Sequence, residues 1–157
     1  MQSMHFIIVQ INGLCWTKND DQSYHVATEK LTFPEAQKYC ENLNATLVSI
    51  QSPEQNKFLR NLTNTFLSVK YKWLHETIWL NGQQTMAGSE HFKWLDGMPF
   101  NYTNWYPGNP DELQENYINC ILMSFASGHW GDTNCYNQHG TLCVVRQKFS
   151  YFQLVFI

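Results

Sequence analysis

Residues Thr32–Cys40 (TFPEAQKYC) combine the signal for a helix start with a cysteine. Thr32 and Glu35 have the spacing of a capping box, in which the two side chains satisfy free amides of the first helical turn. Pro34 falls in that turn, where its missing N–H is tolerated. The apolar residues that follow share one face at helical spacing, namely Phe33, Ala36, Cys40 and Leu43. We predict a helix over residues 33–43 that buries its cysteine.

The rest of the chain predicts one more helix and several short strands. Ser52 and Pro53 repeat the helix-start signal, and an apolar stripe follows, so we predict a helix over residues 53–67. Residues 98–117 are rich in Asn, Pro and Gly and predict one long loop, which in a compact domain is usually functional. Short apolar runs predict strands at 46–50, 78–80, 92–95, 118–125 and 141–146, with a further strand beginning at 24–27. This order predicts an α+β domain.

Composition limits the class of protein. A length of 157 residues favours one domain, and 15% aromatic with 15% charged residues is a globular composition. The net charge of -3 provides no basic field for nucleic acid or an anionic membrane. No run of about 20 apolar residues is present, so we expect no membrane partner. Residues 1–23 are read as an N-terminal segment, with an intact signal peptide and a truncated remnant both open.

Cysteines and glycosylation motifs point to an extracellular, secreted glycoprotein. The five cysteines are Cys15, Cys40, Cys120, Cys135 and Cys143. Three acceptor triplets for N-glycosylation begin at Asn44, Asn61 and Asn101. Together these features favour an oxidising compartment in which disulfides persist.

Zinc competes with disulfides for the same cysteines. Cys135-x3-His139-x3-Cys143 has ligand-like spacing, and Cys120 or His129 would complete a tetrahedral set. This alternative leaves Cys40 and the glycosylation motifs unexplained. Residue patterns alone leave several pairings of the cysteines open.

From residue 24 to residue 146 the chain resembles the C-type lectin-like family. Tyr24 and five further stretches match family motifs in the family's order: 33–40 (FPEAQKYC), 45–50 (ATLVSI), 78–82 (IWLNG), 92–111 (FKWLDG followed by YTNWYPGNPD) and 130–135 (WGDTNC). The resemblance implies two helices packed on short antiparallel sheets, with a long loop region. It places the domain at residues 24–147, between the N-terminal segment 1–23 and an apolar tail at 148–157.

The resemblance also implies a disulfide pattern. Cys40 is expected to pair with Cys143, and Cys120 with Cys135. The long form of the family has an additional N-terminal pair, but Ser23 stands where the partner of Cys15 would be. We therefore expect no intramolecular partner for Cys15, which leaves a covalent dimer through this residue open.

Sugar-binding members of the family hold sugar hydroxyls through a calcium ion, and the same side chains bind both. Calcium takes 6–8 oxygen ligands. By resemblance, the ligands for calcium and carbohydrate here are Asn109, Asp111, Glu115 and Asp132, with Glu112 as the alternative to Glu115. An amide before the proline and an acid after it resemble the galactose type. The bond before Pro110 is expected to be cis.

This ligand set departs from the family pattern at three places. Gly131 replaces an asparagine ligand, and Asn109 is one methylene shorter than the usual glutamine. Leu113 stands where an aromatic ring would stack on galactose, so Tyr106 or Trp130 would have to serve. Two functions follow: calcium-dependent binding of a glycan or glycoprotein, or calcium-independent recognition of a protein ligand. We expect no enzyme, because the six histidines are scattered and no nucleophile motif is present.

Overall fold

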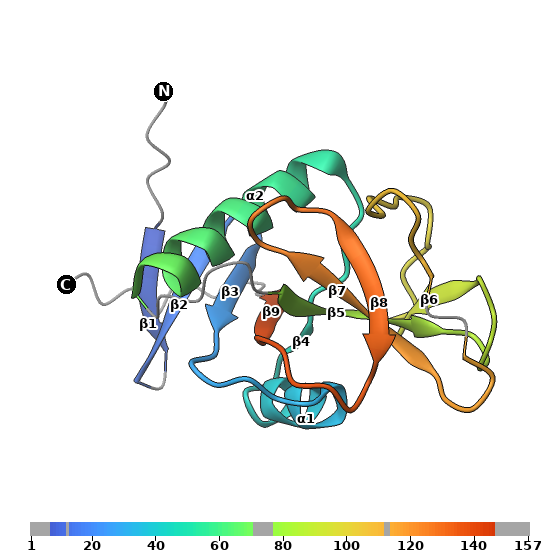
Figure 1. Ribbon diagram of the computed structural model, residues 1–157. Coiled ribbons are helices and arrows are strands. Elements are labelled where there is room, and N and C mark those ends of the chain that lie inside the picture. Colours follow the sequence, from blue (N-terminus) through green and yellow to red (C-terminus); the bar gives the residue numbers. More distant parts are fainter. Residues whose placement is uncertain (1–6, 12, 71–76, 112–113, 147–157) are drawn as a thin grey trace.

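The computed structural model describes residues 7–11, 13–70, 77–111 and 114–146. Two helices, one π-helical turn and short antiparallel strands make up this part of the chain (Figure 1). In chain order the elements are β1 (Ile7–Ile11), β2 (Leu14–Asn19), β3 (Gln22–Val26), α1 (Phe33–Asn42), β4 (Thr46–Leu47), α2 (Pro53–Thr63), η1 (Asn64–Lys70), β5 (Thr77–Gln84), β6 (Phe92–Trp94), β7 (Asn119–Ser124), β8 (Trp130–Asn134) and β9 (Leu142–Arg146). The predicted α+β class is confirmed.

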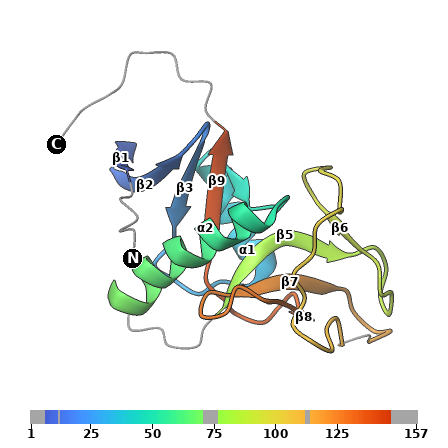
Figure 2. The same cartoon turned by 90° about the horizontal axis from the view of Figure 1, so that it is seen from above.

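The strands form two sheets, one of order β1-β2-β3-β9-β4 and one of order β6-β5-β7-β8. In the first sheet the last strand, β9, lies between β3 and β4 and is antiparallel to both. The beginning and the end of the domain are therefore paired directly. Figure 2 shows α2 and the five-stranded sheet on one side of the molecule, with β5 to β8 and their loops on the other.

Both helices begin where the sequence predicts. The carboxylate of Glu35 accepts hydrogen bonds from the amide of Thr32 at 2.9 Å and from its hydroxyl at 2.8 Å. These bonds, the amide bond first, lower the pKa of Glu35. The hydroxyl of Ser52 accepts from the amide of Gln55 at 3.1 Å, which caps α2. α2 ends at Thr63 and continues as η1, whereas the sequence predicted one helix to residue 67.

An Asn-Gly pair is typical of a turn, but Asn81 and Gly82 do not form one. Both lie inside β5, where the register with β7 shifts between Trp79 and Gln83. A Cβ on Gly82 would come within 2.5 Å of the Ile121 side chain. The glycine therefore allows close approach of β7, which is a common reason for glycine inside a strand.

The five-stranded sheet extends beyond residue 24 toward the N-terminus. β1 pairs with β2, and β2 pairs with β3, so strands from the predicted N-terminal segment belong to the same sheet as β9. Trp16 in β2 is buried in the core beside α1. The tail at 148–157 lies outside the described residues. In the part of the chain that the structure describes, no helix has the length and apolar character of a membrane span.

Two disulfides brace the domain, and they are the predicted ones. Cys40 in α1 is bonded to Cys143 in β9, and Cys120 in β7 to Cys135 after β8. The zinc alternative is therefore wrong, since its cysteines are oxidised. His139 instead makes a 2.6 Å hydrogen bond through Nδ1 to the hydroxyl of Thr77. Cys15 is exposed and not disulfide-bonded.

His25 is a buried histidine that joins three elements. Its Nδ1 lies 2.9 Å from the carbonyl oxygen of Cys15 in β2, and its Nε2 lies 2.8 Å from the hydroxyl of Tyr39 in α1. Because a carbonyl only accepts, Nδ1 carries the proton and Nε2 accepts from Tyr39. Burial lowers the pKa of His25, and the bond to the Cys15 carbonyl opposes this in part. The neutral imidazole is thus the form that fits.

We expect the domain to lose stability as the pH falls below about 6.5, the usual histidine pKa. The unfolded chain binds a proton there while folded His25 does not, so stability is full above that pH and declines toward the lower folded pKa. The slope for one group reaches about 1.4 kcal/mol per pH unit. Urea unfolding between pH 8 and 5 measures it. In His25→Gln, the slope of the free energy of unfolding against pH should decrease by the contribution of one proton. An unchanged slope would contradict this assignment.

Candidate functional site

The loop that carries Asn109 and Asp111 lies along strand β8. The amide of Tyr106 donates to the carbonyl of Trp130 at 2.8 Å, and the amide of Asp111 donates to Oδ1 of Asp132 at 3.0 Å. Between these two attachments the amide of Asn109 donates to the carbonyl of Tyr106 at 2.8 Å and closes a turn. We call residues 105–111 the site loop. Both ends of its central turn are therefore fixed to one strand.

Trp130 of β8 is the buried residue on which the site loop packs. Its indole N–H donates to Oδ1 of Asn56 in α2 at 2.8 Å, and the side chain is fully buried. Four aromatic rings surround it with centroids 5.5–6.4 Å away: Trp94, Phe100, Tyr102 and Trp105. A ring in this position cannot stack on a sugar, so the sequence-based alternative of Trp130 as a stacking residue is wrong.

Tyr106 is the aromatic residue of the site loop that faces solvent. It is 58% exposed, and its ring meets that of His129 edge-on at a centroid distance of 5.7 Å. The turn from Tyr106 to Asn109 places this ring in the same short segment as the predicted amide ligand. Of the two stacking candidates, only Tyr106 is therefore accessible to a ligand.

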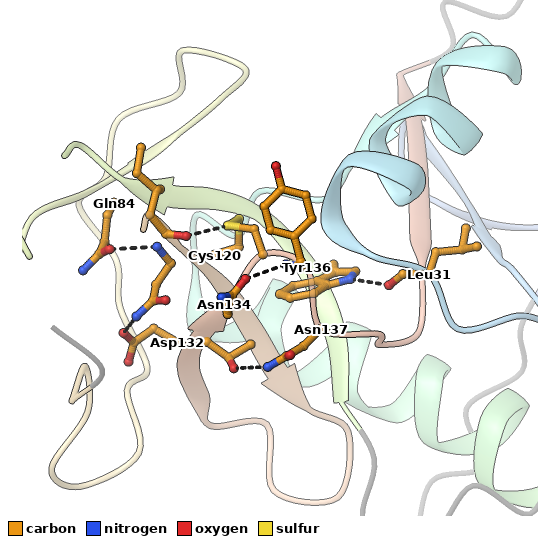
Figure 3. The surroundings of a disulfide bond; sticks show 12 residues. Leu31, Gln84, Cys120, Asp132, Asn134, Tyr136 and Asn137 are labelled. Atoms are coloured by element: carbon orange, nitrogen blue, oxygen red, sulfur yellow. Dashed lines mark hydrogen bonds between the residues drawn. A yellow bond between two sulfur atoms is a disulfide. The ribbon is translucent and has the colours of Figure 1, made fainter. Parts of the chain in front are cut away.

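Asp132 belongs to a buried polar network, and Figure 3 shows it together with Gln84. While Oδ1 holds the Asp111 amide, Oδ2 accepts from the side-chain amide of Asn119 at 3.0 Å. The backbone amide of Asn119 donates to Oε1 of Gln84 at 2.7 Å, and Gln84 in turn donates to the Ser89 carbonyl at 2.9 Å. The network runs from the β5–β6 turn through β7 and β8 to the site loop. It fixes the backbone of Asp111.

Asn109 occupies the space that Gly131 leaves free. A Cβ on Gly131 would stand 3.0 Å from Oδ1 of Asn109 and 3.4 Å from Leu122. The bond between Asn109 and Pro110 is cis, as expected. Asn109 and the backbone amide of Asp111 therefore lie against two neighbouring residues of β8, Gly131 and Asp132. A larger residue at position 131 would have to displace the amide of Asn109.

Glu115 lies close to the turn between β5 and β6. Its Cγ would be 3.4 Å from a Cβ on Gly88, and its backbone follows at 3.7 Å. The alternative acid, Glu112, and Leu113 lie outside the described residues. The structure thus places the predicted ligands Asn109 and Asp111 beside Gly131 and Asp132, and Glu115 against a neighbouring turn.

These residues fit a calcium ion only in part. Calcium requires 6–8 oxygens, and a site with fewer or already occupied ligands binds weakly. Both carboxylate oxygens of Asp132 accept protein hydrogen bonds, and Gly131 supplies no side-chain ligand. In the described ranges no three acidic, histidine or cysteine side chains form a metal-binding group. These residues therefore fit a calcium ion that binds weakly at most.

Sequence reasoning missed Asn119, Gln84 and Asn56, which position the site. All three side chains are buried. Polar residues inside apolar strands and helices were the signal that could have identified them, because buried polar groups almost always have partners. Which partners they take depends on strand pairing, and the sequence does not show it.

Comparisons with known proteins agree with this architecture. Residues 29–145 match the Lectin C-type domain family. The chain is 34% identical to bovine E-selectin over 125 residues and 26% identical to human C-type mannose receptor 2 over 128 residues. These matches cover 77% and 82% of this chain, but only 24% and 8% of the relatives, so the chain spans a small part of their length.

Solved structures extend the likeness to the fold. The mouse scavenger receptor C-type lectin carbohydrate-recognition domain has a TM-score of 0.69 at 27% identity and covers 85% of this chain and 96% of its own. A Ca2+-dependent type II antifreeze protein in its Ca2+-free form has a TM-score of 0.68 at 30% identity, with 83% and 96% covered. The family match spans most of the chain, and the disulfides and sheets agree with it. The chain belongs to the C-type lectin domain family.

Proposed function

We propose that the site loop and the end of β8 bind carbohydrate. The observation that carries this proposal is the convergence of Asn109 and Asp111 on Gly131 and Asp132. An amide that donates and a carboxylate that accepts can bind two neighbouring sugar hydroxyls. The exposed ring of Tyr106 offers an apolar surface beside them. Amide before acid is the polarity of the galactose type, so galactose is the expected ligand class.

Calcium would strengthen this site if bound. Asn109, Asp111 and Asp132 would hold the ion, with Glu115 as a further ligand, and the ion would supply positive charge to sugar hydroxyl oxygens. The protein's own contribution is to fix the Asp111 backbone through Asp132 and to keep Asn109 against β8. The domain itself presents the hydroxyl-binding side chains with or without the ion.

Retention on immobilised galactose tests the proposal directly. We expect retention in calcium that falls when a chelator is added, and weaker retention on mannose. Asp111→Ala removes a charged hydrogen-bond partner worth about 1.5–3 kcal/mol, which is roughly a tenfold to hundredfold loss of affinity. Glu29→Ala, an exposed acid outside the site loop, is the matched control and should bind normally. Full retention by Asp111→Ala would place binding elsewhere.

The melting temperature in calcium without sugar measures ion binding separately from sugar binding. A calcium ion with a dissociation constant of about 1 mM stabilises the folded domain by about 1.4 kcal/mol at about 10 mM calcium. For a domain of this size that raises the melting temperature by roughly 3–6 °C. The absence of a shift at 10 mM calcium would remove calcium from the function.

A calcium-independent protein-recognition module is the second candidate. It is favoured by the two protein hydrogen bonds on Asp132, which satisfy its carboxylate without an ion. Under this alternative, binding to the protein partner persists in chelator, and the melting temperature is the same with and without calcium. The two experiments above separate the candidates.

An extracellular, glycosylated form is part of the proposal. The two disulfides suit an oxidising compartment, and Asn44 and Asn101 are exposed acceptors. Asn61 is half-buried on α2, and the hydroxyl of Thr63 in its triplet donates to the Leu59 carbonyl. Glycopeptide mapping should therefore find glycans at Asn44 and Asn101 first.

The exposed thiol of Cys15 is the proposed link between two chains. Cys15 lies in β2, and β1 is the outer strand beside it in the sheet that the structure describes. If two β1 edges paired, the two β2 strands would be three strand spacings apart, about 14 Å. A disulfide needs Cα atoms within about 7 Å. A covalent dimer would therefore have to join sheet faces rather than sheet edges.

A further inference from the structure

A groove lies beside the first turn of α2, away from the site loop. It consists of a cavity of about 340 Å³ and an adjoining one of about 570 Å³. The two share Gln22, Gln55 and Met98, while Asn44, Ser49 and Asp96 line the smaller part. We call this region the α2 groove. None of the residues of the site loop lines it, so it is a separate feature of the domain.

Ser49 marks the smaller cavity as a place for a polar occupant. Its side chain is only 8% exposed, and its hydroxyl has no hydrogen-bond partner. The neighbouring amide of Gln55 donates to the Ser49 backbone carbonyl at 3.2 Å and leaves the hydroxyl free. Buried hydroxyls are nearly always paired in folded proteins. An occupant with polar atoms in this cavity would supply the missing partner.

Charge limits which occupant the groove can take. Asp96 lines the smaller cavity, and three more acids line the larger one: Asp20, Asp21 and Glu54. Among the side chains that the structure describes, none that lines either part is a lysine, arginine or histidine. The walls therefore offer carboxylate and amide acceptors, while Val48 and Val144 add apolar surface. This combination disfavours anions and suits a neutral ligand that is rich in hydroxyl groups.

Asn44 is a glycosylation acceptor at the rim of the smaller cavity. It is exposed, it lines the smaller cavity, and it begins the glycosylation triplet Asn44-Ala45-Thr46. Its positive φ of 55° sets it in the turn between α1 and β4, in the tight left-handed conformation that asparagine tolerates. Thr46, the third residue of the triplet, is exposed as well.

We propose that an N-linked glycan on Asn44 folds back into the α2 groove. Its first N-acetylglucosamine units lie in the smaller cavity beside Ser49, and the mannose units reach the acidic larger cavity. The glycan thus covers the start of α2 and the adjoining edge of β4. The ligand of this groove is carried by the chain itself, whereas the site loop remains open for an external sugar.

Enzymatic deglycosylation of the folded protein tests this. The full chain is secreted from a eukaryotic host that leaves high-mannose glycans, and endoglycosidase H release is followed at each site by mass spectrometry. We expect the Asn44 glycan to be released at least tenfold more slowly than the exposed Asn101 glycan in the native state. After denaturation the two rates should be equal. Asn101 serves as the internal control because it does not line the groove.

Ser49→Ala supplies the matched variant. Since the hydroxyl has no protein partner, its removal should leave the melting temperature of the unglycosylated protein unchanged. In the glycosylated protein, release at Asn44 should become severalfold faster, while release at Asn101 stays the same. An unmodified Asn44, equal native rates at both sites, or unchanged protection in Ser49→Ala would overturn the proposal. Asp111→Ala should leave the protection of Asn44 intact, which keeps this test independent of sugar binding at the site loop.

Discussion

Replacing Cys40 and Cys143 together by alanine is expected to lower the free energy of unfolding by about 4.7 kcal/mol. The bond closes a loop with a sequence separation of 103 residues, and its loss frees most of the unfolded chain. It also ties α1 to β9, the strand that pairs with β3. Because small domains are stable by about 5–15 kcal/mol, the variant should be close to unfolding at 37 °C. Urea unfolding at 25 °C measures the loss.

The shorter disulfide provides the comparison. Cys120 and Cys135 are separated by 15 residues, so their joint replacement should cost about 3 kcal/mol, less than the long bridge. Equal losses for the two double variants would mean that constraint of the unfolded chain is not the main contribution. Loss of the short bridge should also weaken sugar retention, because it braces β7 and β8 below Asp132.

Trp130→Ala is expected to cost about 3–5 kcal/mol, the usual range for truncating a buried tryptophan. The fully buried ring contacts aromatic residues of the long loop and of β6, and it holds Asn56 of α2 through its N–H. Its loss opens a cavity and leaves the Asn56 amide oxygen without its donor. Since the long loop packs on this ring, retention on galactose should fall together with stability.

Trp130→Phe separates packing from hydrogen bonding. Phenylalanine keeps much of the aromatic contact but cannot donate to Asn56, so we expect a smaller loss of about 1–3 kcal/mol from the unpaired oxygen. Asn56→Ala should give a similar loss, and the double variant should cost less than the sum of the two. Additive losses in the double variant would show that the indole–amide bond does not couple the two residues.

Local elements follow from local sequence. The capping signals at Thr32 and Ser52 predict the helix starts: Glu35 accepts from the Thr32 amide, and Ser52 accepts from the Gln55 amide. Strands β6, β7 and β9 lie where short apolar runs predict them. Asn81 and Gly82 show the limit of such rules: the pair reads as a turn, but the approach of Ile121 makes the glycine part of a strand. Tertiary contact overrides turn chemistry at that position.

The N-terminal strands β1 and β2 were not predicted, because their stability comes from pairing rather than from periodicity. Only β3, held against β9 from the far end of the chain, provides an edge on which β2 and then β1 can form. A single sequence does not report such long-range pairing. The same reason explains why Asn119 and Gln84 were missed as parts of the site.

The sequence by itself determined the helix starts, the α+β class, the cysteines available for bridging and the acid–amide pair around Pro110. These features depend on residues close together in the chain. Only the tertiary structure decided that Trp130 is buried and that Tyr106 is exposed. It also decided that both carboxylate oxygens of Asp132 accept hydrogen bonds, one from the Asp111 amide and one from the Asn119 side chain. Burial and hydrogen-bond partners depend on which strands meet. Which strands meet depends on the whole chain, so the arrangement of the proposed ligands could not be predicted from local sequence.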